Sequence, residues 1–182
     1  MKKIILYFTI LLVFSSCDKD SLTWELKRLS SKDARLEVSD LIYSNNCSAM
    51  TGFQLIATGP GSPSSIYWGI SNNGFSGDCF MTQGSSTNAT IIFNLNITKG
   101  GILRFYFKNG SIYEINSQPS LKINTIPINT AIISGNQDSK GEWLQMQTEL
   151  LKPGNNTVEI KFSVGTIKTF YIDEIELWTP RY

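Results

Sequence analysis

Apolar and polar residues alternate with a period of two along most of the chain after residue 34. The clearest runs lie at 91–97, 103–107, 121–123 and 158–164, and shorter apolar segments lie at 53–57 and 66–70. Because successive side chains of a strand point to opposite faces, such alternation gives one buried face and one wet face. Clusters of Gly, Asn, Ser and Pro at 59–63, 71–74 and 152–156 separate the runs. The pattern predicts an all-β, antiparallel sandwich or barrel, with no amphipathic helix of ordinary length after residue 40.

The last alternating run shifts its phase by one residue. Phe170 and Ile172 form one apolar pair, Ile175 and Leu177 form another, and Asp173 with Glu174 adds one residue between them. A β-bulge at this point would keep all four apolar side chains on the core face. Since bulges re-aim side chains, we expect Asp173 to point at a particular partner.

The composition excludes several kinds of chemistry. The 182 residues contain no His, so Ser-His-Asp hydrolysis, Cys-His proteolysis and His-based zinc sites are impossible within this chain. A net charge of +1 gives no electrostatic reason to expect nucleic acid. There is no phosphate-binding P-loop and no Gly-x-Ser-x-Gly elbow, and no motif marks a pair of glycosidase carboxylates. We therefore predict that the protein is not an enzyme.

The first twenty residues have the pattern of an export signal. A basic start at Lys2 and Lys3 precedes a mostly apolar run at 4–14 and the small residues Ser15 and Ser16. The alternatives are a transmembrane anchor or a buried helix, but eleven residues rise only about 16 Å as a helix, against a bilayer core of about 30 Å. The run 13–18 resembles a bacterial lipobox, apart from Phe14 where Leu is usual. The resemblance implies a signal peptide over 1–16, acyl chains on Cys17, and lipid anchoring in the bacterial envelope.

The residues that follow bear on which membrane holds the protein and on where the folded domain begins. Asp18-Lys19-Asp20 resembles both a surface-export tag, which implies the outer membrane or cell surface, and an inner-membrane retention signal. Residues 17–33 form a polar tether, and a β-sandwich binding domain is predicted over 34–182. The apolar side chains of the tether indicate either a short helix or an irregular segment that docks on the domain: Leu22, Trp24, Leu26 and Leu29.

Two cysteines remain once Cys17 is assigned to lipid. In an exported protein Cys47 and Cys79 are expected to form a disulfide, which would stabilise the fold by about 3–4 kcal/mol. The alternative is two unrelated buried thiols.

Three stretches of the domain resemble jelly-roll modules of the galactose-binding and carbohydrate-binding kind. Residues 101–107 resemble the central core strand, 142–158 resemble the step from a Trp through a Pro-Gly turn to a strand, and 171–177 resemble the closing strand. The chain departs from that pattern at 124–129, where a turn with Asp-Gly is common. The resemblance implies a jelly-roll β-sandwich. It also indicates Asp173 and Glu37 as candidate ligands of a structural calcium ion, but calcium usually takes six to eight oxygen ligands, so we expect no metal or other cofactor and keep calcium as the alternative.

Candidate ligand-binding residues gather in the segment 67–83. Sugar recognition uses aromatic rings beneath C–H groups and amide or acid side chains on hydroxyls, and the segment offers Tyr67, Trp68, Asn72, Asn73, Phe75 and Asp78. Trp68 alternates with two isoleucines and has a core role as its alternative, and we expect Trp143 and Trp178 to be packing anchors. The sequence thus predicts a non-catalytic module that binds glycan. The second hypothesis is a structural or adhesive subunit that contacts another envelope protein.

Overall fold

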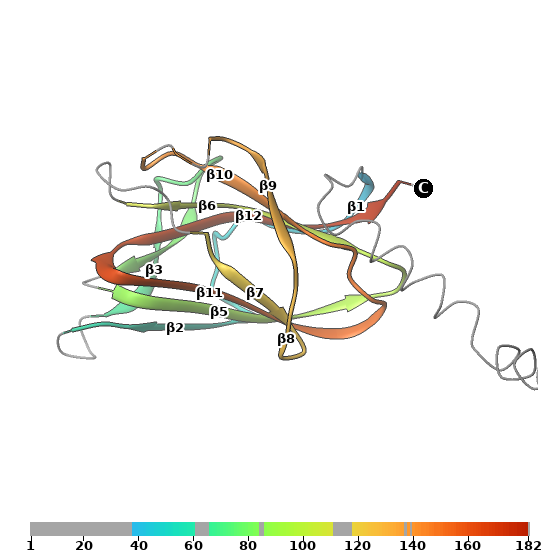
Figure 1. The fold of residues 1–182 in the computed structure, drawn as a ribbon, viewed down its shortest axis with the longest axis horizontal. Helices are drawn as coiled ribbons and strands as arrows, with labels where there is room; N and C mark the ends of the chain where they lie inside the picture. Colours follow the sequence, from blue (N-terminus) through green and yellow to red (C-terminus); the bar gives the residue numbers. More distant parts are fainter. Residues whose placement is uncertain are drawn as a thin grey trace, which may run out of the picture.

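The fold consists of two antiparallel β-sheets that face one another (Figure 1). The computed structural model describes residues 38–60, 66–83, 86–110, 118–136, 138 and 140–181, apart from the side chains of 164–168. The predicted signal peptide, Cys17, the tether and Glu37 lie outside the described residues. The described part contains no helix of the length and apolar character needed to cross a membrane.

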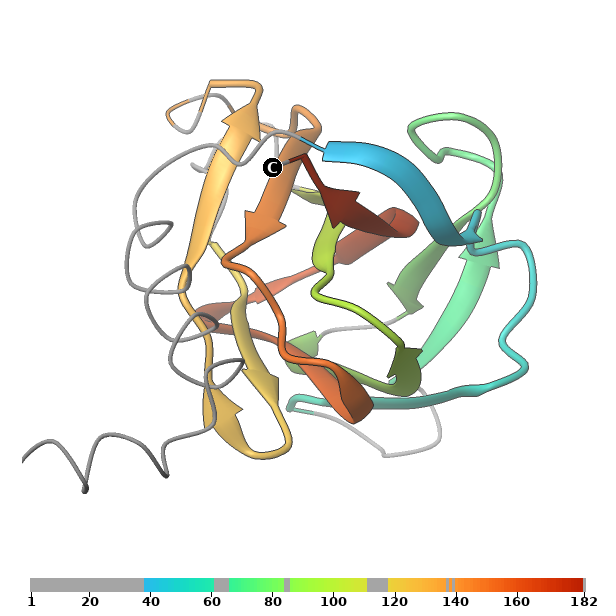
Figure 2. The ribbon, with the colours of Figure 1, turned by 90° about the vertical axis from the view of Figure 1, so that its right-hand side faces the viewer.

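The larger sheet has seven strands. Its order is β3 (Tyr67–Ser71), β4 (Cys79–Gln83), β12 (Phe170–Pro180), β6 (Ile102–Asn109), β10 (Leu144–Thr148) and β9 (Thr130–Ser134), and β1 (Val38–Asn45) also pairs with β12. Figure 2 shows β1 in blue beside the dark red end of β12.

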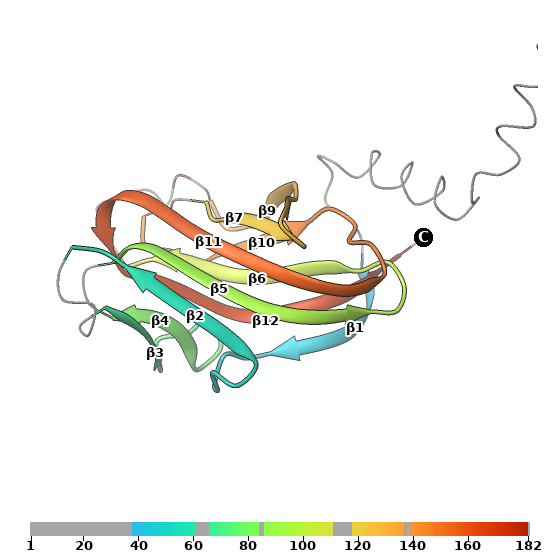
Figure 3. The same ribbon diagram turned by 90° about the horizontal axis from the view of Figure 1, so that it is seen from below.

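The smaller sheet has five strands in the order β2 (Phe53–Thr58), β5 (Ser86–Ile97), β11 (Gly154–Lys168), β7 (Ser120–Ile123) and β8 (Ile126–Pro127). Figure 3 shows β2, β5 and β11 running side by side. All strand pairs are antiparallel, as the alternation predicts.

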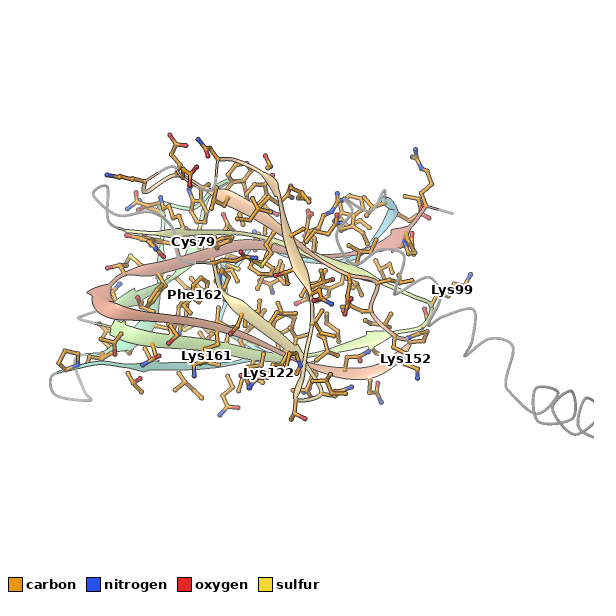
Figure 4. All side chains as sticks on the ribbon, in the orientation of Figure 1. Cys79, Lys99, Lys122, Lys152, Lys161 and Phe162 are labelled. Carbon is orange, nitrogen blue, oxygen red and sulfur yellow. The ribbon has the colours of Figure 1, made fainter. Side chains whose placement is uncertain are left out.

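The core lies between the sheets and is made by the residues that alternate in the sequence. Phe105 and Phe107 of β6 are fully buried, and the ring of Phe107 lies 6.3 Å from that of Phe162 of β11. Figure 4 labels Phe162. The apolar members of the 91–97 run in β5 are buried as well. Burying one such side chain stabilises the fold by roughly 1.5–3 kcal/mol, so these runs supply most of the driving force for closing the sandwich.

Trp68 belongs to this core, so its predicted role in ligand binding is wrong. Only 5% of its surface is exposed, its indole N–H donates to the carbonyl oxygen of Ile56 at 2.9 Å, and its ring lies 6.5 Å from that of Phe162. The pleat sends Trp68 inward next to the buried Ile66, as the alternation indicates, whereas Ile70 toward the end of β3 is 42% exposed.

The predicted disulfide is also wrong, since Cys47 and Cys79 are both free, buried thiols. Cys47 belongs to the apolar core cluster, whereas Cys79 precedes the core residue Phe80 in β4 and therefore faces the other side of the sheet. Burial raises the pKa of Cys79 to about 11 and raises that of Cys47 further, so both remain protonated at neutral pH. They behave as small apolar side chains, which is the alternative that the sequence left open.

A two-residue turn connects β7 to β8 where the chain departs from the jelly-roll pattern. Ile123 pairs with Ile126, and the residues between them, Asn124 and Thr125, have φ angles of 50° and 71°. Two successive positive φ angles are the mark of a type I′ hairpin, which favours Asn-Gly. Asn124 suits the first position and accepts the N–H of Thr157 at 2.8 Å, but Thr125 is β-branched and strained in the second.

Candidate functional site

The bulge predicted in the last strand is present and it buries an acidic side chain. The pairing of β12 with β6 shifts register between Asp173 and Glu176, and Glu174 has a φ of 48°. Phe170, Ile172, Ile175 and Leu177 are all buried, as the phase slip predicts. The extra residue leaves Asp173 fully buried on the outer side of the seven-stranded sheet, beneath the loop that joins β3 to β4.

Asp173 anchors that loop through its carboxylate. One oxygen, Oδ2, accepts the backbone N–H groups of Phe75 at 2.8 Å and Ser76 at 3.2 Å, and Oδ1 accepts the N–H of Glu174 at 2.7 Å. Burial raises the pKa of the carboxyl above its ordinary value, and the three N–H donors oppose that shift. The hydroxyl of Ser76 also donates to Glu174, so loop and bulge are joined at two points.

Gly74 allows the loop to fold this tightly. Its N–H donates to the carbonyl oxygen of Gly77 at 2.8 Å. A Cβ at position 74 would lie 2.5 Å from that same oxygen and 2.7 Å from Oδ2 of Asp173. Only a residue without a side chain fits between the loop and its anchor.

Four aromatic rings meet on the outer face of the seven-stranded sheet, and we call them the outer-face aromatic cluster: Phe75, Tyr106, Trp143 and Tyr171. Phe75 stacks on Tyr106 with ring centroids 3.7 Å apart and an interplanar angle of 11°. Trp143 stands edge-on to Phe75 at 6.3 Å and to Tyr171 at 6.3 Å. Phe75 keeps 49% of its surface exposed, and since Tyr106 covers one side of the ring, the other side is open to solvent.

Lys108 places a cation within this cluster. Its amino nitrogen lies 4.6 Å from the ring centroid of Trp143 and 4.9 Å from that of Tyr171, within cation–π range. The same nitrogen is 3.5 Å from the carbonyl oxygen of Asn73. Burial lowers the pKa of Lys108 from its ordinary value.

Polar side chains continue the outer face along the same strands. Arg104 lies beside Glu176 in the pairing of β6 with β12 and beside Gln147 in the pairing with β10. Its Nε and Nη2 donate to Oε1 of Gln147 at 2.9 and 2.7 Å, which holds the guanidinium against the sheet. Gln145 pairs with Tyr106, so an amide group lies next to the aromatic cluster.

The structure brings only part of the predicted ligand-binding set together. Phe75 is in the cluster, and Asn72, Asn73 and Asp78 are exposed in the loop that carries it. Tyr67 is 56% exposed on the edge strand β3, and Trp68 is in the core.

Three residues of the cluster and Lys108 were missed as site residues. Alternation with Phe105 and Phe107 already placed Tyr106 and Lys108 on a wet face. Trp143 packs as expected of an anchor, but it does so on the outer face. The sequence held no signal that these strands are neighbours, because strand pairing is a long-range property.

Of the two candidate calcium ligands, the structure describes only Asp173. Among the described residues, no group of three or more His, Cys, Asp and Glu side chains is placed to hold a metal ion. Both oxygens of Asp173 accept backbone N–H groups, so this carboxylate holds the loop. The other proposed ligand, Glu37, lies outside the described residues.

Comparison with known proteins establishes the fold. No protein-family model matches the sequence, and no curated protein matches it. A family 35 carbohydrate-binding module from Clostridium thermocellum is similar in structure, with a TM-score of 0.50 and 13% identity over 75% of this chain and 98% of that module. The K1 cleaved adhesin domain of Lys-gingipain from Porphyromonas gingivalis W83 has a TM-score of 0.50 and 14% identity over 75% of this chain and 97% of that domain. The chain is a jelly-roll β-sandwich, as its resemblance implied.

Proposed function

We propose that the protein is a non-catalytic binding module that takes glycan chains on the outer-face aromatic cluster. The observation that carries the proposal is the open ring face of Phe75, which the loop holds flat against Tyr106. Four hydrogen bonds of the loop and the bulge keep this aromatic ring at the surface. Because a half-exposed ring loses part of its hydrophobic stabilisation, this exposure indicates a binding role.

The chemistry around that ring fits a sugar. The apolar face of a pyranose presents C–H groups, which are attracted to the negative face of an aromatic ring. Its hydroxyls need donors and acceptors nearby. Asn72 and Asp78 are exposed in the loop that carries Phe75, and Gln145 pairs with Tyr106. The similar fold of a carbohydrate-binding module supports the proposal at the level of the scaffold only.

Binding of polysaccharides to the folded protein tests the proposal. The full chain carrying Cys17→Ser, which removes the proposed lipid site, would be run through affinity gels and a glycan array. We expect retention on at least one polysaccharide and a loss of about 5- to 30-fold in affinity for Phe75→Ala, since stacking on one ring is worth roughly 1–2 kcal/mol.

Tyr67→Ala is the matched control, because Tyr67 is an equally exposed aromatic residue on β3 of the same sheet. We expect this control to bind as the parent does. No retention on any polysaccharide by a folded sample would contradict the glycan proposal. Capture of another envelope protein that Phe75→Ala abolishes would favour the adhesive alternative.

We also propose that the module is held in the bacterial envelope by acyl chains on Cys17. The support is the basic start, the short apolar run and the Ser-Ser-Cys sequence. Labelling cells with an alkynyl fatty acid should mark the parent protein and leave Cys17→Ser unlabelled. Fractionation of the labelled cells would then show which membrane holds it.

A further inference from the structure

A second concave site lies far from the aromatic cluster, between the β7–β8 hairpin and the connection from β10 to β11. The pocket holds about 350 Å³. Its apolar lining comes from Ile123, Ile126, Ile128, Leu150, Leu151 and Pro153. Ile126 at the rim is 62% exposed, more than any other large apolar side chain in the described residues. The rest of the lining is polar and comes from Asn124, Lys152, Asn155 and Asn156. A mixed wall of this kind suits a large side chain that is apolar with one polar group, such as that of Trp.

The wall of the pocket is connected through strand pairings to the point where the described chain begins. Val38 pairs with Pro180 at the end of β12, Trp178 of β12 pairs with Ile102, and Gly101 bridges Leu151 in the pocket wall. Val38 and Leu151 are thus separated by about three strand spacings, or roughly 14 Å. Figure 1 places the C-terminus at the right-hand end, and Figure 4 places Lys152 at that same end.

The chain before Val38 carries a matching apolar segment within reach. Leu22, Trp24, Leu26 and Leu29 are the large apolar side chains of an otherwise polar stretch from 17 to 33. Eight residues lie between Leu29 and Val38, and the nine Cα–Cα steps of an extended chain span up to about 30 Å. This distance covers the path from Val38 across the end of the sheet to the pocket.

We propose that residues 22–29 dock in this pocket, with Trp24 as the central anchor. The pocket volume suits one or two large side chains, and docking removes both Trp24 and the rim residue Ile126 from water. In this placement Glu25, next to Trp24 in the sequence, approaches Lys152 of the pocket lining, and the two basic residues Lys27 and Arg28 face the solvent. The consequence is a module held close to its proposed membrane anchor, with only the residues before 22 as a free tether. The inference does not depend on glycan binding.

Photocrosslinking in the full chain tests this docking directly. A benzophenone amino acid would replace Trp24, and irradiated monomer would be digested and mapped by mass spectrometry. We expect intramolecular crosslinks to peptides that contain Ile126 or the 150–153 connection. A benzophenone at Ser31 is the control and should give few such products. Crosslinks confined to other faces, crosslinks between two copies, or none at position 24 would overturn the proposal.

A double-mutant comparison in the same full chain gives an independent answer. We expect Trp24→Ser and Ile126→Asp each to lower the thermal midpoint by about 2–5 °C, and the double variant to lie no lower than the worse single. Ile56→Asp is the matched control, because Ile56 is 41% exposed on β2 and lies outside the pocket. Its effect should add to that of Trp24→Ser. Additive effects of Trp24→Ser and Ile126→Asp would show that the two residues do not meet.

Discussion

Replacing Asp173 by Ala should release the loop that carries the aromatic cluster. The carboxylate is fully buried and accepts the N–H groups of Phe75, Ser76 and Glu174. Alanine removes the acceptor for all three groups and leaves a space beneath the loop. We therefore expect a loss of stability together with loss of order around Phe75.

The magnitude follows from those three bonds. A hydrogen bond to a charged group contributes roughly 1.5–3 kcal/mol, which gives a gross value of about 4–9 kcal/mol. Burial of the carboxylate offsets part of this, as its raised pKa shows. The N–H groups of Phe75 and Ser76 can also regain water when the exposed loop opens. The expected net loss is about 2–4 kcal/mol, a large share of the 5–15 kcal/mol typical of a domain.

Urea unfolding followed by circular dichroism measures the loss, and native-state hydrogen exchange locates it. The amides of Phe75 and Ser76 should lose protection in Asp173→Ala, whereas those of the core strand β5 should change only with global stability. Asp78→Ala is the control, since Asp78 is an exposed acid in the same loop, and it should change stability by less than about 0.5 kcal/mol. A stability change below about 0.5 kcal/mol in Asp173→Ala, or unchanged protection of Phe75 and Ser76, would refute the anchoring argument.

Three further predictions use other positions. Thr125→Gly should raise the free energy of unfolding by about 0.5–1 kcal/mol in urea titrations, because glycine relieves a φ of 71°; lower stability would contradict the turn assignment. Gly74→Ala should cost about 1–3 kcal/mol and weaken glycan retention, because its Cβ would lie 2.5 Å from the Gly77 oxygen; normal retention would show that the loop can shift. Folding raises the pKa of Asp173, so the folded chain binds this proton more tightly. The free energy of unfolding of the wild type, relative to that of Asp173→Asn, should therefore fall as the pH rises from about 3.8 through the pKa of Asp173 in the folded chain. Paired urea titrations measure this difference, and a rise over the same pH range would contradict a raised pKa.

The sequence by itself determined the strands and the core faces, because alternation is a local property of the pleated backbone. The runs in β5, β6 and β11 are buried where the period of two places them, and the phase slip at Asp173 is a bulge. Turn residues such as Gly154 also mark where a strand begins. β1 and β9 were not predicted, because they lie at the sheet edges and bury little. β4 was not predicted because its five residues are too short a run to show a clear alternation.

Only the tertiary structure decided which outward-facing residues meet. Phe75, Tyr106, Trp143 and Tyr171 come from four separate segments, and they form a cluster because β12, β6 and β10 are neighbours in the sheet. The same pairing sets the face of each thiol, so an even cysteine count could not reveal that Cys79 faces away from the core. Strand order depends on contacts between residues far apart in the chain, and a local pattern carries no information about those partners.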